Sequence, residues 1–185
     1  MSSTVGHALC GVSCWLLARQ HIKTSNKLIG YGWLAGFVLL AGLPDLDFIA
    51  GYIYANNFHY FHSGPSHSIF GIIFTTAVIA MLWPVKRNYK LLAWIFIALA
   101  THVAIDLFTG PQPGLHKSYG VALFWPFTNE RITMPVSLFY GVQHATFSDL
   151  VSWHNVKVMA IETLTFGLLL LFVYHWTRTP NFKAG

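Results

Sequence analysis

The sequence predicts an all-α protein that crosses a membrane several times, with about five transmembrane helices. Of its 185 residues, 55% are hydrophobic and only 9% are charged, whereas soluble domains usually carry about 25% charged residues. The mean hydropathy is +0.53, and the apolar residues are gathered into separate stretches. No linker divides the chain, so we expect one membrane-embedded domain that comprises residues 1–185.

Five apolar stretches are expected to form helices. They comprise residues 5–18, 28–43, 68–83, 91–108 and 156–176. A membrane span needs about 20 residues, or as few as about 17. The first two stretches therefore span a bilayer only if the polar residues at their ends are buried in the protein.

Two of the connections between these stretches are long. The first, residues 48–66, is aromatic and rich in turn residues. The second, residues 109–155, contains prolines and glycines that make a long regular helix unfavourable. Loops of such length are usually lids or binding elements. The aromatic side chains of the second connection also suit the level of the lipid headgroups. A membrane-surface anchor and a lid that admits lipid both fit this pattern.

The charged residues separate when the five stretches are threaded alternately across a bilayer. One side receives eight of the eleven basic residues, namely Arg19, Lys23, Lys27, Lys86, Arg87, Lys90, Arg178 and Lys183. The positive-inside rule makes this side cytoplasmic, with the C-terminus inside and the N-terminus outside. The outer side receives all six acidic residues. Because the basic residues flank apolar runs and form no continuous stripe, nucleic acid is not an expected partner.

Carboxylates and imidazoles are concentrated at the outer ends of these stretches. Ionisable groups at bilayer depth cost roughly 2.5–3.5 kcal/mol each, so they are seldom present without a use. Carboxylates beside imidazoles are ligands of zinc-type ions. The candidate metal ligands are His7, Asp45, Asp47, His62, His67, His102, Asp106 and Glu162.

The paired residues among these candidates carry most of the argument. His102 and Asp106 lie one helical turn apart on the same face. They can bind one metal together, or the carboxylate can orient the imidazole. Asp45 and Asp47 follow an apolar run, where a bend would bring both to one site; a solvated helix end or an N-cap is the alternative.

The histidines of residues 59–67 and of the long loop are less clear in isolation. A turn at residues 64–65 can fold His67 back towards His62, which favours ligation, while Ser66 or Ser68 can cap the helix that follows. A hydrogen-bonded interfacial residue is the alternative for either imidazole, and it is the expectation for His59. The long loop contains His116, His144 and His154. These histidines are expected to be solvated, and contact with a substrate is the alternative.

These motifs together resemble the YdjM-type membrane-bound, metal-dependent hydrolases. The resemblance rests on Leu-Pro-Asp-Leu-Asp at residues 43–47, His-x-Gly-x-Ser-His-Ser at 62–68, His-x-x-x-Asp at 102–106 with Thr109, and Leu-Phe-Trp-Pro at 123–126. Gly6-His7 and Glu162 fit the same pattern. The family is thought to be distantly similar to zinc-dependent phospholipases C and zinc nucleases. This implies a helical enzyme of the bacterial inner membrane with two or three zinc ions.

The resemblance implies a zinc-dependent hydrolase that cleaves a phosphoester bond in a lipid or lipid-linked substrate at the outer leaflet. Asp45, Asp47 and Glu162 are the candidate catalytic carboxylates. The family commonly has Arg after the first histidine of the pair, whereas this chain has Ser63, which implies either a less anionic substrate or another cation, such as Lys117 or Arg131, in its place. A non-catalytic metal-binding protein is one alternative. An ion or lipid transporter is another, although the apolar cytoplasmic halves of the helices count against it.

The threading predicts the location of both the C-terminus and the long outer connection. A reporter fused after Gly185 should be cytoplasmic, and a thiol introduced at Ser118 should react with an impermeant reagent added from outside. The opposite labelling pattern would reverse the orientation of the candidate metal site.

Overall fold

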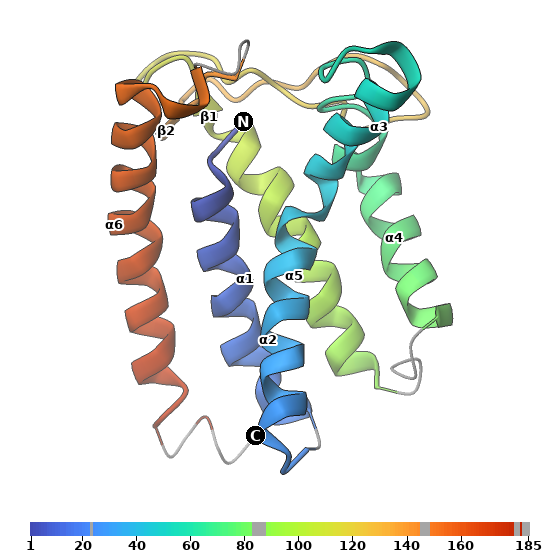
Figure 1. The fold of residues 1–185 in the computed structure, drawn as a ribbon, viewed down its shortest axis with the longest axis vertical. Coiled ribbons are helices and arrows are strands. Elements are labelled where there is room, and N and C mark those ends of the chain that lie inside the picture. Colours follow the sequence, from blue (N-terminus) through green and yellow to red (C-terminus); the bar gives the residue numbers. More distant parts are fainter. Residues whose placement is uncertain (23, 83–87, 145–148, 180–181, 183–185) are drawn as a thin grey trace.

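The protein is a bundle of helices that run side by side along the long axis of the molecule (Figure 1). We describe it from a computed structural model, in which residues 1–22, 24–82, 88–144, 149–179 and 182 are described. The five expected helices are present as α1 (Thr4–Ala18), α2 (Lys27–Gly42), α4 (Ile69–Leu82), α5 (Tyr89–Leu107) and α6 (Trp153–Trp176). Residue 83, the expected end of the third helix, lies outside the described residues.

Three helical segments are long and apolar enough to cross a membrane. They are Lys27–Ala55, Tyr89–Leu107 and Trp153–Trp176. Helix α4 is apolar but shorter, with 14 residues, and α1 has 15. A membrane protein is thus confirmed by composition and helix length, whereas the five-span arrangement stays a prediction.

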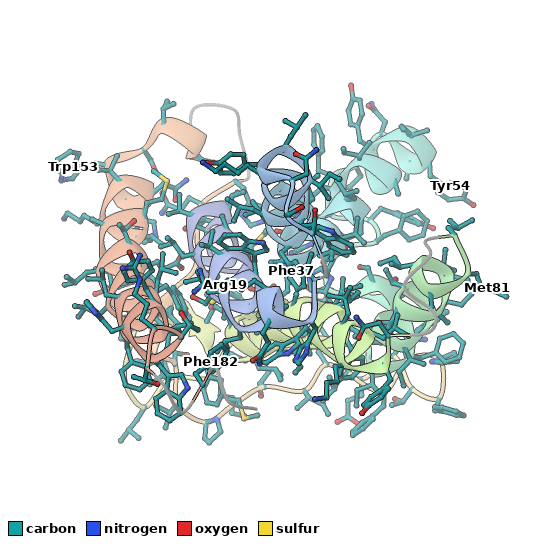
Figure 2. All side chains as sticks on the ribbon, turned by 90° about the horizontal axis from the view of Figure 1, so that it is seen from below. Arg19, Phe37, Tyr54, Met81, Trp153 and Phe182 are labelled. Atoms are coloured by element: carbon teal, nitrogen blue, oxygen red, sulfur yellow. The ribbon has the colours of Figure 1, made fainter. Side chains whose placement is uncertain are left out.

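Helix α1 lies in the middle of the bundle. It packs against α2, α5 and α6, while α4 packs on the outer side of α5. The core lies between α1, α2 and α5, where Phe37 is fully buried. Viewed along the bundle, Phe37 lies near the centre, and Tyr54, Met81 and Trp153 project from the periphery (Figure 2). The apolar side chains that cover the outside of the bundle suit contact with lipid.

The segment of residues 48–66 differs from its expected form, because it begins as a helix. A 3-10 turn (Leu43–Leu46) with Pro44 in its first turn redirects the chain, and α3 (Asp47–Ala55) follows directly. Asn56 ends α3 in the left-handed conformation, with φ 51°. The chain then folds back across Gly51, where a Cβ atom would lie 2.8 Å from the Asn57 carbonyl oxygen. The turn residues of this segment are concentrated after residue 55, so residues 48–55, which are mostly apolar, form a helix of their own beyond the 3-10 turn.

The long connection between α5 and α6 folds over the end of the bundle where the N-terminus lies (Figure 1). Strand β1 (Thr109–Gly110) pairs in parallel with β2 (Phe139–Tyr140), and isolated bridges join Gly114 to Ser137 and Val121 to Ile132. A 3-10 turn at Asp149–Val151 leads into α6. Backbone pairing between its two halves thus gives the described part of this connection a defined fold.

Several basic residues lie at one end of the bundle. Four basic residues belong to the end opposite the N-terminus: Arg19, Lys27, Lys90 and Arg178. Lys23, Lys86, Arg87 and Lys183 lie outside the described residues. Ser118 is only 6% exposed and its hydroxyl accepts hydrogen bonds from the Gly120 and Met134 amides, so it is a poor labelling position. Leu115, 90% exposed in the same loop, serves the labelling experiment better.

The close approach of α1 and α2 depends on Gly11. A Cβ atom at Gly11 would lie 2.6 Å from the Phe37 carbonyl oxygen and 2.9 Å from the Val38 Cα atom, neither of which can rotate away. Gly11→Ala should therefore destabilise the fold by about 1–3 kcal/mol. Gly36→Ala is the matched control and should be neutral or slightly stabilising, because a Cβ atom at this helical glycine would meet nothing within 4 Å. Thermal unfolding of the two purified variants in detergent checks this; equal midpoints would contradict it.

Candidate metal site

Two groups of potential metal ligands meet at the end of the bundle under the long loop. The four-ligand group consists of Asp45, His67, His102 and Asp106, and the three-ligand group consists of Asp47, His62 and His67. Within each group, the ligand atoms lie within 4.8 Å of one another. The structure thus brings together six of the eight ligands predicted from the sequence, and they come from separate segments of the chain.

Local structure aims these side chains at one point. His102 and Asp106 lie one turn apart near the end of α5, and the His102 Nδ1 donates to the Ala41 carbonyl oxygen of α2, 2.7 Å away. This hydrogen bond fixes the ring proton and leaves Nε2 as the ligand atom, which is the usual arrangement for metal-bound histidine. Asp45 lies in the 3-10 turn that ends α2.

His67 is positioned by the turn before α4. It ends the 3-10 turn Pro65–His67, and the Ser68 hydroxyl accepts a hydrogen bond from the Gly71 amide at 2.9 Å. The expected Ser68 cap is therefore confirmed, and it fixes the point at which the chain enters α4. Position 71 has no room for a Cβ atom, because the Pro65 carbonyl lies directly against Gly71.

The four-ligand group has the spacing of a tetrahedral metal site. The His102 Nε2 atom lies 3.1 Å from the His67 Nε2, 3.3 Å from the Asp45 Oδ1 and 3.5 Å from the Asp106 Oδ2. The His67 Nε2 lies 3.5 Å from the Asp106 Oδ2 and 3.6 Å from the Asp45 Oδ1. Ligand bonds of about 2.0–2.2 Å to a tetrahedral zinc ion separate neighbouring ligand atoms by about 3.3–3.6 Å. The observed distances fall close to that range.

The hydrogen bonding of this group also fits a cation. Among the described residues, the Asp45 Oδ1 and Asp106 Oδ2 atoms are buried and have no hydrogen-bond partner. A buried carboxylate oxygen without a partner is strongly destabilising. A positive charge between the two oxygens and the two imidazole nitrogens would satisfy all four atoms. The donor set and its burial therefore fit a zinc-type ion.

The charge balance around His67 supports the same interpretation. Burial by itself lowers the pKa of His67, but the carboxylates of Asp106, Asp45 and Asp47 outweigh this effect and raise its pKa well above the usual value. The site thus favours a positive charge at its centre. A proton on His67 and a bound metal ion compete for the same carboxylates, so acid should weaken metal binding.

The three-ligand group lies next to the first and shares His67 with it. The Asp47 Oδ1 lies 3.1 Å from the His62 Nδ1, and its Oδ2 accepts a hydrogen bond from Ser66 at 2.6 Å and lies 3.1 Å from the His67 Nδ1. Burial lowers the pKa of His62 more than Asp47 raises it, which keeps this imidazole in the neutral form that binds metal. Neither Asp45 nor Asp47 is therefore the solvated helix end considered from the sequence.

His7 and Glu162, the other two predicted ligands, belong to neither ligand group. The His7 ring stacks on His102 with centroids 3.7 Å apart, and its Nε2 lies 3.7 Å from the Asp106 Oδ1. Both nitrogens of His7 are buried without a hydrogen-bond partner among the described residues. His7 thus contacts the site directly, and its role as a ligand stays a prediction.

Glu162 connects the site to the N-terminal segment. Its carboxylate accepts hydrogen bonds from the Ser2 hydroxyl at 2.8 Å and the Ser3 amide at 3.0 Å, and from the Ser3 hydroxyl. The Ser2 amide in turn donates to the Asp106 Oδ1 at 2.8 Å. A Cβ atom at Gly6 would lie 2.5 Å from the Glu162 Oε2. Glu162 therefore reaches Asp106 through Ser2, and its predicted roles as ligand and catalytic group stay predictions.

A cavity of about 500 Å³ borders the three-ligand group. Its lining includes His62, Ser63 and Arg131, together with Met1, His59, Tyr119, Val142, Gln143, His144 and Asp149. A second cavity, of about 440 Å³, is lined by residues such as Trp15, Arg19 and Thr177 from the opposite end of the bundle. Only the first of these two is lined by a residue of the ligand groups.

Some residues at the site were left open by the sequence analysis, and others were missed. The Arg131 Nη2 donates to the His62 carbonyl oxygen at 2.9 Å, whereas Lys117 is not among the lining residues. The bridge between Val121 and Ile132 places Arg131 there, and the pattern of the loop alone gives no signal of that register. Ser2, Ser3 and Ser66 were likewise missed as contacts of the site, because isolated serines carry no spacing signal.

The remaining histidines divide between the cavity and the loop surface. His59 and His144 line the cavity, where His59 is exposed and His144 is half-buried. His116 is exposed beside Gln112, as expected, and the His154 Nε2 lies 2.8 Å from the Gly141 carbonyl oxygen.

Comparison with known proteins relates the chain to a family of membrane proteins. No curated protein and no solved structure matches the chain. The family profile described as YdjM inner membrane protein matches residues 1–180, which include every residue of the two ligand groups. The match covers nearly the whole sequence and agrees with the apolar helices and the buried histidine and aspartate cluster. The chain therefore belongs to the YdjM inner membrane protein family.

Proposed function

We propose that this protein is a zinc-dependent hydrolase of a phosphoester bond in a lipid or lipid-linked substrate at the outer leaflet of the membrane. The observation that carries the proposal is the convergence of two imidazole nitrogens and two carboxylate oxygens at 3.1–3.6 Å inside an apolar bundle. Such a set of ligands has no evident structural use in a helix bundle, where apolar residues would pack at lower cost.

The two ligand groups support different roles. Structural zinc sites use four protein ligands, whereas catalytic sites use three and keep one position open for water or substrate. The four-ligand group is complete with protein atoms alone. The three-ligand group supplies only three protein ligands and borders the 500 Å³ cavity through His62. We therefore assign the reaction to the three-ligand group and a supporting role to the four-ligand group.

The residues of the three-ligand group would hold the reacting atoms in place. A zinc ion bound there would supply an activated water and polarise a phosphoryl oxygen. Asp47 would orient the His62 ring through the 3.1 Å contact with Nδ1, and Asp45 or Asp47 would accept the proton of the attacking water. The Ser66 hydroxyl holds the Asp47 Oδ2 at 2.6 Å, which limits rotation of the carboxylate.

The position of the site supports a lipid substrate. Ligands and cavity lie at one end of a bundle whose outer faces are apolar, so lipid can approach without leaving the bilayer. Exposed aromatic residues of α3 and the turn after it, such as Tyr52, Tyr54 and Tyr60, suit the headgroup level at the same end. The outer leaflet is assigned from the distribution of basic residues.

A non-catalytic metal-binding protein is the second candidate. The closed character of the four-ligand group favours it, because a site filled by protein ligands leaves no position for a substrate. In that case the three-ligand group would form a hydrogen-bonded support for His67.

Metal content gives the first test. When the wild-type protein is purified without chelator, each of the two ligand groups should hold one zinc ion. His102→Ala and Asp106→Asn should each lose the ion of the four-ligand group, because each removes one of its four protein ligands. His116→Ala is the matched control, since His116 is exposed in the loop and lies outside both groups. Elemental analysis measures the zinc content of the four proteins. If His102→Ala and Asp106→Asn both hold as much zinc as the wild type, the metal site is contradicted.

Hydrolysis gives the second test. The zinc-loaded protein should release the headgroup or phosphate from a phospholipid or a chromogenic phosphoester, and a chelator should stop the reaction. Asp47→Asn should lower the rate at least about 100-fold, because it removes a ligand or base of the three-ligand group. Glu130→Gln, at an exposed acidic residue of the outer loop, should retain the wild-type rate. Bound zinc without hydrolysis of any phosphoester would favour the non-catalytic candidate.

A further inference from the structure

We propose that the cavity beside His62 is an anion site that holds the phosphate group of the substrate, with Arg131 as its main ligand. This inference rests on the proposed function, because it names the substrate group that the metal site would act on. Four observations carry it: the available donors of Arg131, the polar lining, the size of the cavity and its connection to the three-ligand group.

Arg131 has N–H donors at the cavity that make no hydrogen bond within the described part of the chain. Its guanidinium carries five N–H donors in a planar fork that matches the oxygens of a phosphate. Within the part of the chain that the structure describes, the guanidinium makes one hydrogen bond, from Nη2 to the His62 carbonyl oxygen at 2.9 Å. That bond anchors the side chain at the cavity and leaves the other donors for a ligand.

The rest of the lining is polar and suits a phosphate ester. The lining includes Tyr119 and Ser63, whose side chains carry hydroxyl groups, and His59 and His144, whose side chains carry imidazoles. The His144 Nδ1 lies 3.0 Å from the Val142 carbonyl oxygen, which orients the ring and leaves Nε2 for a ligand. Among the described lining residues, Asp149 is the one carboxylate, so groups that can donate to an anion outnumber those that repel it.

The cavity has the size of a headgroup site. Its volume of about 500 Å³ lies within the usual range for small-molecule sites. It therefore suits a phosphate with a small polar substituent, while the acyl chains of a lipid remain against the apolar outer faces of the helices. A metal ion alone is a poor occupant, because the cationic side chain of Arg131 lines the cavity.

The connection to the ligand groups is direct. His62 lines the cavity, its carbonyl oxygen accepts from Arg131, and its Nδ1 lies 3.1 Å from the Asp47 Oδ1. A phosphate on Arg131 would thus lie beside the three-ligand group. Ser63 lies next to His62 in the lining of the cavity, with φ 58°.

The test measures binding of inorganic phosphate to the full-length protein by calorimetry, with and without zinc. Arg131→Gln should weaken phosphate binding at least about ten-fold, because it removes a charge-assisted, bidentate donor. The phosphate affinity of Arg131→Lys should lie between those of the wild type and Arg131→Gln, since lysine keeps the charge but lacks the planar, bidentate donors of arginine. Lys117→Gln, an exposed cation of the same loop outside the cavity, is the matched control and should bind as the wild type does.

Metal content and thermal unfolding of each variant separate the possible failures. Weaker binding by Arg131→Gln at unchanged zinc content and unfolding midpoint supports the anion site. Unchanged binding by that variant overturns the anion site and leaves the proposed function standing. If the wild type binds no zinc, the proposed function fails, and the Arg131 dependence of phosphate binding in the metal-free protein still decides the anion site.

A second arm distinguishes the source of the phosphate. Short-chain phosphatidic acid and phosphatidylcholine in detergent are compared with inorganic phosphate as competitors. Tighter binding of phosphatidic acid than of inorganic phosphate supports a lipid headgroup as the ligand, provided that Arg131→Gln weakens it. Competition by all three that is insensitive to Arg131→Gln would overturn the assignment of the cavity.

Discussion

The architecture of this protein is organised around negative charge that is buried in an apolar bundle. Asp45 and Asp106 point oxygens into the interior where no described hydrogen-bond donor meets them, and the imidazoles of His67 and His102 face the same point. Such a centre is stable only when a positive charge resides in it. The turns that end α2 and precede α4, and the last turn of α5, all serve to bring these groups together.

The packing around this centre follows from the same requirement. The N-terminal segment is held between α5 and α6, because Ser2 donates to Asp106 and both Ser2 and Ser3 donate to Glu162. Gly6 permits that approach, and Gly11 permits the close contact of α1 with α2. Helix α1 is therefore central to the bundle although it is too short to be an obvious membrane span. Its small residues allow neighbouring backbones to approach closely, as in membrane helices generally.

Much of this could be predicted from the sequence, and the rest could not for definite reasons. Apolar stretches predicted the five long helices, and the His102–Asp106 spacing predicted a shared site because one helical turn separates the two. Helix α3 was missed because aromatic residues near turns resemble a connection. Arg131 could be named only as one of two candidates, because its position depends on a backbone bridge between Val121 and Ile132. The link from Glu162 to Asp106 through Ser2 depends on tertiary packing that has no local pattern.

His67 has a property that reaches beyond the geometry of either ligand group. Its Nε2 faces Asp45, Asp106 and His102, while its Nδ1 faces Asp47 and Ser66. A neutral imidazole carries one proton, so a cation held at Nε2 places that proton on Nδ1, and a second cation in the three-ligand group would have to displace it and leave His67 as a bridging imidazolate. The protonation state of a single ring therefore couples metal binding in one group to metal binding in the other. The two groups are thermodynamically linked, and each affinity depends on the occupancy of its neighbour in a reciprocal way.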